Sequence, residues 1–371
     1  MSKVTQPHTG GEPAGLTEVP AAVRDALEAL FDERLAEAAE IGAPVMSAAA
    51  HLRSFVLGGG KRIRPLYAWA GFIGSPGPGR RSEDPAAVLR AVSSLELIQA
   101  CALIHDDIID ASDTRRGNPT VHRAVEAEHR SAGLFGDAAD YGRNVAILAG
   151  DLALMWAEDC WRGSGVSAAA LERAFQPWRA MRTEVIGGQL LDIAIEAQAD
   201  ESIESADRVN RYKTASYTIE RPLHLGAALA GAPAATIAAY RAYGRDIGVA
   251  FQLRDDILGV FGDAAVTGKP AGDDLREGKR TVLLATALSL LDAQSPASAA
   301  LLRQRVGRAT DPAELRELAG LVESSGAVDA VERRIAELTA SGLAHLDAAR
   351  VDPAVARTLT DLAVRATERR A

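Results

Sequence analysis

Three aspartates stand close together in the stretch HDDIID at residues 105–110. The run before them, residues 89–104, is mostly apolar and contains no glycine or proline, which predicts a buried helix that continues into the acidic residues. In a helix Asp106 and Asp110 lie one turn apart on one face, with Asp107 beside them, and carboxylates at this spacing repel each other. A cation is therefore expected here, and oxygen-only ligands suit a hard ion such as Mg²⁺.

A second acidic pair ends another apolar stretch, FQLRDDILGVFGD at residues 251–263. It places Asp255 and Asp256 near the end of a predicted helix, but Gly259 stands at the fifth position, where the first motif has Asp110. For a single acidic cluster, a solvated helix face is the commoner interpretation. The repetition instead predicts two walls of one helical bundle that hold divalent ions around a polyanion.

Basic residues gather beside glycines or beside the acidic motifs: Lys61, Arg62 and Arg64 in GGGKRIRP, Arg115 and Arg116 in TRRGNP, and Lys269 in TGKP. Backbone amides of the glycines can approach an anion that the side chains neutralise. For Arg62 and for Arg280 in REGKR, a solvated loop charge is the preferred interpretation. Acids that hold Mg²⁺, bases that hold phosphate and apolar helices between them predict a diphosphate substrate with a hydrophobic remainder.

The elements that must position these residues are predicted to be helices, and the fold to be an all-α bundle. Helical periodicity extends over segments near 21–40, 43–57, 62–72, 86–110, 143–161, 167–196, 203–220, 222–231, 233–259 and 279–293, with four shorter ones to the C-terminus. Residues 1–20 are rich in Gly, Pro and Thr and are expected to form a flexible leader. No shift in composition divides the rest, so residues 21–371 are expected to form a single helical domain.

Composition narrows the possible partners and the compartment. The net charge of -9 argues against a nucleic-acid surface, and a transmembrane segment is not expected because no run of eighteen uncharged apolar residues appears. Cys101 and Cys160 lie in apolar helical runs, which favours neither a disulfide framework nor a thiolate metal site. A soluble protein of a reducing compartment, the cytoplasm, is expected.

The ordered motifs GGGKRIRP, LIHDDIIDASDTRRG, GGQLLD, KT, FQLRDDILG and GKPAGDDLREGKRT closely resemble those of the trans-polyprenyl diphosphate synthases, from about residue 51 to residue 281. These prenyltransferases elongate an allylic diphosphate head-to-tail with isopentenyl diphosphate. The resemblance implies an isoprenoid-synthase helical bundle with a central cavity, a homodimer and the use of three Mg²⁺ ions.

The resemblance also assigns roles to individual residues. As metal ligands it implies Asp106, Asp107, Asp110, Asp192, Asp255 and Asp256, of which Asp106 and Asp110 are principal. For the allylic diphosphate it implies Arg115, Lys213, Lys269 and Gln189, with Thr214 and Gln252 at the reacting centre. For isopentenyl diphosphate, bound without metal, it implies Lys61, Arg64, Gln99 and Arg116. Lys213 and Lys269 count with the aspartates as catalytic, because they stabilise the departing diphosphate.

Product length is predicted from the helix that carries Asp106. Each isoprene unit is about one helical turn long, so a growing tail meets residues about four positions earlier. Cys101 and Ala102 are small where family members that stop at fifteen carbons usually carry a ring, and Ile98 and Leu97 come next. This favours the twenty-carbon geranylgeranyl diphosphate, with farnesyl or longer polyprenyl diphosphates as alternatives. A class I terpene cyclase would not need the metal-free diphosphate pocket, and a non-catalytic regulatory subunit would be expected to lack some of these ligands.

Overall fold

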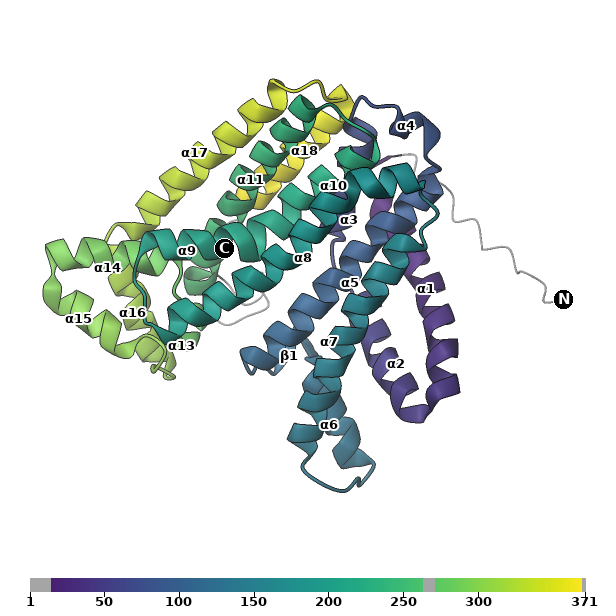
Figure 1. Cartoon of the computed structure of the whole chain (residues 1–371). Helices are drawn as coiled ribbons and strands as arrows, with labels where there is room; N and C mark the ends of the chain where they lie inside the picture. Colours follow the sequence, from purple (N-terminus) through teal and green to yellow (C-terminus); the bar gives the residue numbers. More distant parts are fainter. Residues whose placement is uncertain (1–14, 263–270, 369–371) are drawn as a thin grey trace. The chain divides into compact units, whose positions relative to one another are not determined.

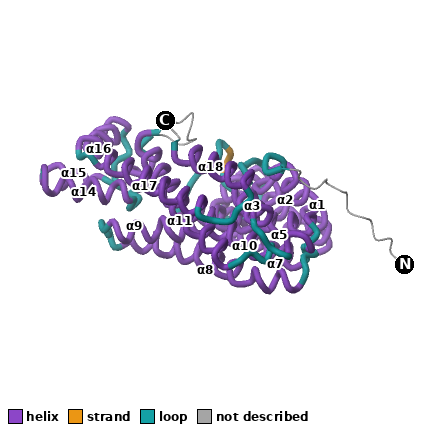
Figure 2. Tube along the Cα trace, turned by 90° about the horizontal axis from the view of Figure 1, so that it is seen from above, coloured by secondary structure: helices purple, strands orange, loops and turns teal. Residues whose placement is uncertain are grey.

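The computed structural model of the chain describes residues 15–262 and 271–368. Within these residues the structure is helical apart from turns and one pair of two-residue strands, Thr114–Arg115 (β1) and Asn118–Pro119 (β2) (Figure 2). The prediction of an all-α fold is confirmed.

The helices form two compact units. The first unit contains the chain up to Gln176 together with Pro222–Pro233, and the second contains Pro177–Arg221 together with the chain from Ala234 onward. The single domain expected over residues 21–371 stays a prediction.

In the first unit the central helix is α5 (Pro85–Ile109), which packs mainly against α7 (Ala138–Arg162) (Figure 1). Around them lie α1 (Val19–Ile41), α2 (Ala43–Leu57), α3 (Ile63–Gly74), α4 (Gly79–Ser82) and α6 (Val121–Ser131). Among the described residues, α5 is the one helix long and apolar enough to cross a membrane, which the sequence alone did not predict. However, 78% of its most apolar 18-residue window is buried inside the protein, as in the core helix of a bundle.

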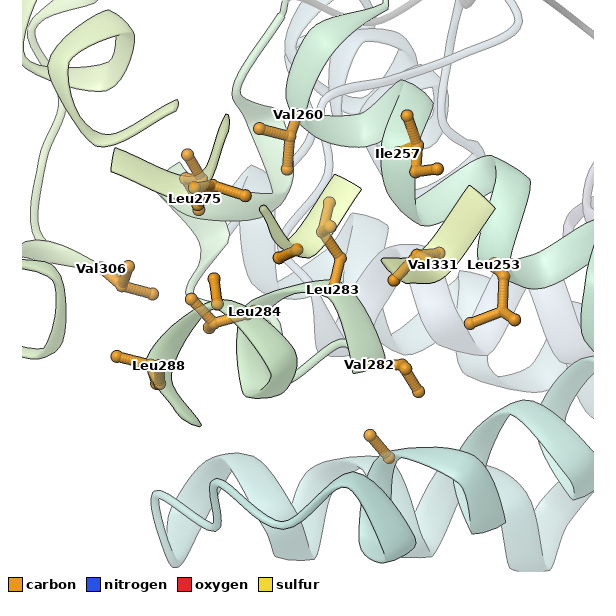
Figure 3. Close-up of a cluster of buried hydrophobic side chains, with 14 of the residues drawn as sticks. Leu253, Ile257, Val260, Leu275, Val282, Leu283, Leu284, Leu288, Val306 and Val331 are labelled. Atoms are coloured by element: carbon orange, nitrogen blue, oxygen red, sulfur yellow. The ribbon is translucent and has the colours of Figure 1, made fainter. Parts of the chain in front are cut away.

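In the second unit the central helix is α11 (Ala234–Phe261). It packs against a π-helix, η1 (Asn210–Glu220), and against α17 (Ala327–Asp347). The unit also contains α9 (Ile203–Val209), α13 (Asp273–Glu277), α14 (Val282–Gln294), α15 (Pro296–Arg305), α16 (Pro312–Ser324) and α18 (Pro353–Thr367). Leu253, Ile257 and Val260 of α11 contribute to a core that also contains Leu275 of α13 and Leu283 of α14 (Figure 3).

Two helices cross the boundary between the units along the chain: α8 (Ala168–Ala197), which contains Pro177 where the units divide, and α10 (Arg221–Leu229). The helix boundaries agree with the predicted segments to within a few residues, and the four helices at the C-terminus are present. Among the described residues, three helices were not predicted: α6, which is highly charged, and the short α4 and α13. The segment predicted as helix over 203–220 changes from α to π geometry at Asn210.

Candidate active site

The first acidic motif lies at the C-terminal end of α5. The helix ends at Ile109 and Asp110 caps it, so the three carboxylates stand where the helix dipole already carries partial negative charge. Asp107 is only 1% exposed, and its Oδ2 has no hydrogen-bond partner among the described residues. Burial raises the pKa of Asp107 to about 6, with a further contribution from Asp106 and Asp110, while Arg115 opposes the shift. This helix end favours a bound cation.

The consecutive residues Arg115 and Arg116 contact different partners because a two-residue turn begins at Arg116. Arg116 and Gly117 connect β1 to β2 and both have positive φ, as a two-residue hairpin turn requires. The Nε of Arg115 donates to Oδ1 of Asp107 at 2.7 Å, and a second guanidinium nitrogen lies 3.4 Å from Asp106 Oδ2. Arg116 instead donates to the backbone oxygen of Gly59 at 3.1 Å. Arg115 therefore belongs to the acidic motif and Arg116 to the glycine loop.

Arg116 lies within a group of cations. Its pKa is lowered by burial first and then by the neighbouring guanidinium groups of Arg115, Arg62 and Arg64, against the opposing effect of Glu96. Positive charges gathered in this way favour the binding of an anion without a metal. Lys61 is exposed at the start of the same segment, and Gln99 is half-buried on α5, one turn after Glu96. The structure thus places Arg64 near Arg116, two of the four residues expected to bind isopentenyl diphosphate.

The expectation of a solvated loop charge at Arg62 is wrong. Its side chain is 6% exposed and pairs with the equally buried Glu96 of α5, Nη1 to Oε2, at 2.5 Å. A second nitrogen donates to the backbone oxygen of Val56 at 2.6 Å. Arg62 therefore fastens the loop that carries Lys61 to α5. No signal in the sequence distinguishes it from the exposed Lys61 beside it, because its partner lies 34 residues away.

In the second unit, α8 and η1 approach closely and bring a lysine onto an aspartate. A Cβ atom on Gly188 would lie 2.6 Å from the Cα of Lys213, so only glycine permits this approach. Lys213 Nζ lies 2.5 Å from Asp192 Oδ2, and Gln189 is half-buried next to Gly188. The motifs GGQLLD and KT therefore form one group of residues. A π-helix at this point agrees with a functional role, since such segments are frequent at functional sites.

A chain of hydrogen bonds connects the π-helix to the second acidic motif. The hydroxyl of Thr214 donates to Gln252 Oε1 at 2.7 Å, and Gln252 Nε2 donates to Asp256 Oδ1 at 2.8 Å. Asp256 is 2% exposed, and burial raises its pKa to about 8, with further contributions from Asp274 and Asp255. Asp255 itself is half-buried. Lys269 lies outside the described residues.

The expected metal ligands can be tested against magnesium chemistry. Within the described parts of the chain, no three His, Cys, Asp or Glu side chains are arranged to hold an ion by themselves. Mg²⁺ is commonly bound by one or two carboxylates together with substrate phosphates, so paired aspartates suffice. The buried oxygens Asp107 Oδ2 and Asp256 Oδ2 have no hydrogen-bond partner in the described structure, and a cation would satisfy them. The residues therefore fit Mg²⁺.

The four residues predicted to set product length divide between two faces of α5. Cys101 Sγ lies 3.8 Å from His105 Nδ1, and His105 Nε2 lies 3.0 Å from the backbone oxygen of Ile147 on α7. Leu97 and Cys101 thus follow the face directed toward α7. Ile98 and Ala102 precede Asp106 by eight and four positions and share its face. Ala102 is half-buried and the other three are buried.

Comparisons with known proteins identify the family of this chain. The polyprenyl synthetase family matches residues 47–322. A geranylgeranyl pyrophosphate synthase from Corynebacterium glutamicum is 60% identical in sequence to this chain, and its crystal structure was solved in complex with isoprenyl diphosphate and magnesium. It superposes with a TM-score of 0.93, covering 96% of this chain and 100% of that one.

Two curated relatives make products of different lengths, as their names state. The geranylfarnesyl diphosphate synthase of Aeropyrum pernix is 34% identical over 284 residues, 74% of this chain and 79% of that protein. The (2E,6E)-farnesyl diphosphate synthase of Mycobacterium tuberculosis is 35% identical over 272 residues, 72% and 68% of the two chains. The chain therefore belongs to the polyprenyl synthetase family and is a trans-polyprenyl diphosphate synthase.

Proposed function

We propose that this prenyltransferase makes geranylgeranyl diphosphate as its main product, by adding isopentenyl diphosphate to allylic diphosphates. The observation that carries the proposal is the 60% identity, over 96% of this chain, to the Corynebacterium glutamicum geranylgeranyl pyrophosphate synthase. The small residues Cys101 and Ala102, which precede the first acidic motif, support it. Terpene cyclisation and a purely regulatory role are not supported, because the matched relatives are named as chain-elongating synthases.

In the first unit the residues divide into two groups with different tasks. Asp106 and Asp110, with Asp107 in support, hold Mg²⁺ for the allylic diphosphate, and Arg115 lies against these carboxylates. Lys61, Arg64, Gln99 and Arg116 bind isopentenyl diphosphate without metal. The separate partners of Arg115 and Arg116 support this division, because one guanidinium lies among carboxylates and the other among cations.

In the second unit Asp255 holds a further Mg²⁺, and Asp256 and Asp192 support it. The enzyme then uses three ions in total. Bound Mg²⁺ supplies positive charge that stabilises the departing diphosphate. Lys213 and Lys269 bind diphosphate directly, with Gln189 in support, and the Thr214–Gln252 hydrogen bond orients groups at the reacting centre. The pairing of Lys213 with Asp192 holds this ammonium group in place before substrate enters.

The reaction breaks the carbon–oxygen bond of the allylic diphosphate and joins the allylic carbon to the double bond of isopentenyl diphosphate. One proton then leaves the new chain. We assign this proton to the departing diphosphate and not to a side chain, and we assign no protein nucleophile. His105 is fixed between Cys101 and the backbone of Ile147, so it has a structural role beside Asp106.

The assay combines purified protein, Mg²⁺, labelled isopentenyl diphosphate and one allylic primer at a time, with products sized by chromatography. Twenty-carbon product is expected from each primer shorter than twenty carbons. A chelator should abolish elongation, and added Mg²⁺ should restore it. Failure to elongate any primer would contradict the proposed function, whereas a main product of fifteen or twenty-five carbons would contradict only the product length.

The two faces of α5 sharpen the prediction for product length. Ala102→Phe places a ring on the face of Asp106, where the tail is expected, and should shift the main product toward farnesyl diphosphate. Cys101→Phe places the ring toward His105 and α7 and should shorten the product less, although it too is expected to act. If neither ring shortened the product, the tail would not follow this helix.

We also propose that the enzyme is a homodimer. Tyr141, Leu148 and Met155 follow each other at intervals of seven along α7 and are exposed to 39%, 61% and 56%, an apolar stripe that a second copy could cover. Light scattering should give the mass of two chains. Leu148→Glu should lower that mass, and the control Ile41→Glu, on the exposed end of α1, should not. A single-chain mass with full activity would contradict the dimer.

A cytoplasmic location is part of the same proposal. Cys101 and Cys160 are free, and burial raises the pKa of their thiols to about 11 and about 12, so both are held as unreactive thiols. Unpaired buried cysteines are usual in a reducing compartment.

A further inference from the structure

The second acidic motif has glycine where the first has its final aspartate. The first reads DDIID over 106–110 and the second DDILG over 255–259. Gly259 lies inside α11 and is not among the glycines with positive φ, so its backbone does not require glycine. Glycine inside a helix costs about 0.8–1.0 kcal/mol relative to alanine. The absence of a side chain at this position therefore needs another reason.

The carboxylate of Asp274 occupies the space beside Gly259. A Cβ atom added at Gly259 would lie 2.9 Å from Asp274 Oδ1 and closer still to its Cγ and Oδ2. Atoms do not approach so closely, so the two cannot coexist without a shift. A carboxylate from another helix thus stands where the side chain of residue 259 would begin.

The position of Asp274 is set by the core of the second unit. The next residue, Leu275, is 2% exposed and belongs to the same hydrophobic cluster as Val260 and Ile257, on either side of Gly259 in α11 (Figure 3). The backbone amides of Gly278 and Lys279 both donate to the backbone oxygen of Asp274. Packing and hydrogen bonds therefore hold this turn of α13 against α11, and the carboxylate with it.

A buried carboxyl oxygen lies close to this arrangement. Asp256 is 2% exposed, and its Oδ2 has no hydrogen-bond partner among the described residues. Asp256 precedes Gly259 by three positions in α11, so it lies on the side of the helix that faces Asp274. Carboxyl groups gathered around an unsatisfied buried oxygen are costly without a counter-charge, and a divalent cation supplies one.

We propose that Asp274 completes the second acidic motif and, with Asp255, forms a pair of Mg²⁺-binding carboxylates equivalent to Asp106 and Asp110. Gly259 follows Asp255 by four positions, so a carboxylate beside Gly259 lies on the same face of the helix as Asp255. A pair, with substrate phosphates, is the number of carboxylates that Mg²⁺ takes. The inference rests on the proposed Mg²⁺-dependent function and adds a residue to it.

The test measures metal binding directly. The melting temperature is recorded against Mg²⁺ concentration at fixed inorganic diphosphate, and the Mg²⁺ concentration at half-maximal stabilisation is compared between variants. Asp274→Asn should raise this concentration about tenfold or more, as expected when a residue that supports a metal is lost. The matched control is Asp273→Asn, because Asp273 pairs with Arg276 and lies one residue away; its concentration should equal that of the wild type.

A swap of the carboxylate between the two positions gives a second, independent measurement. Gly259→Asp alone should lower the melting temperature, because the new side chain overlaps Asp274. Gly259→Asp combined with Asp274→Ala should bind Mg²⁺ more tightly than Asp274→Ala alone, because the carboxylate is restored from α11. This comparison decides the matter even if Asp274→Asn fails to fold.

The outcomes separate this inference from the proposed function. If the wild type responds to Mg²⁺ and elongates primers, but Asp274→Asn responds equally and the swap restores nothing, the inference alone is overturned. A wild type that neither elongates primers nor responds to Mg²⁺ with diphosphate would overturn both. Weaker binding in Asp274→Asn, with recovery in the swap, would establish Asp274 as a ligand.

Discussion

Asp107 and Asp256 occupy the same position in their motifs, each the second aspartate of a pair at the end of a central helix, but they differ in charge. Both are buried, and burial raises both pKa values, to about 6 for Asp107 and about 8 for Asp256. Asp107 receives a hydrogen bond from the guanidinium of Arg115 at 2.7 Å. Asp256 receives one from the neutral amide of Gln252 at 2.8 Å, and the charges of Asp274 and Asp255 raise its pKa further.

The difference shows that one sequence pattern can give two electrostatic environments. Near pH 7 most Asp107 side chains are ionised and paired, whereas most Asp256 side chains carry a proton. A metal ion that enters the first motif competes with Arg115, and one that enters the second motif beside Asp256 favours release of a proton. The two motifs should therefore respond differently to substitution and to pH.

The largest effect is expected from removing charge at the first motif. Asp106→Asn should lower kcat on the order of a thousandfold or more, because a main electrostatic contribution to leaving-group departure is lost. Asp110→Asn should behave similarly. Asp256→Asn should cost only about tenfold, because this residue supports the metal site and is not a principal ligand. Steady-state kinetics of the three variants at saturating Mg²⁺ would measure the difference, and equal losses would contradict the ranking.

An intermediate effect is expected from the two arginines. Arg115→Ala removes the cation that distinguishes the first motif and should raise the Michaelis constant for the allylic primer more than that for isopentenyl diphosphate. Arg116→Ala should do the reverse, since it lies with the glycine loop. Each shift should be about tenfold to a hundredfold, equivalent to the 1.5–3 kcal/mol of a charged hydrogen bond. Identical behaviour of the two variants would contradict the division into two diphosphate sites.

The smallest effect is expected in the stability of the metal-free protein. Because folding raises both carboxyl pKa values above about 3.8, the folded state binds protons more tightly, and stability falls as pH rises. For Asp107 the fall ends near pH 6, and for Asp256 it continues to about pH 8. Asp256→Asn should therefore remove the decrease between pH 6 and 8, a change of a few degrees in Tm.

Calorimetry in the presence of a chelator would measure this change, and Asp107→Asn serves as the control, since it should alter the decrease only below about pH 6. If the Tm of the wild type and that of Asp256→Asn both rise from pH 6 to 8, groups other than Asp256 determine the pH dependence of stability. Persistence of the full decrease in Asp256→Asn would show that Asp256 does not titrate there.

The sequence by itself determined the helices and the location of the acidic motifs. Apolar periodicity is a local property of the sequence, so the central helices of both units and the C-terminal helices could be predicted from it. The order of the charged motifs was enough to identify the family. Helix α6 was not predicted, because its many charged residues leave only a few apolar positions and give no clear apolar periodicity. Those few positions are buried through packing against α7.

Only the tertiary structure decided which charges meet, because those partners come from distant segments. Arg62 stands among basic residues of a glycine loop in the sequence, but in the structure it forms a buried ion pair with Glu96. The turn at Arg116 and Gly117 sends two adjacent arginines to different sites. Asp274 reaches Gly259 because the core around Leu275 holds α13 there. Charge state depends on burial and on neighbours within a few ångströms, and packing alone determines both.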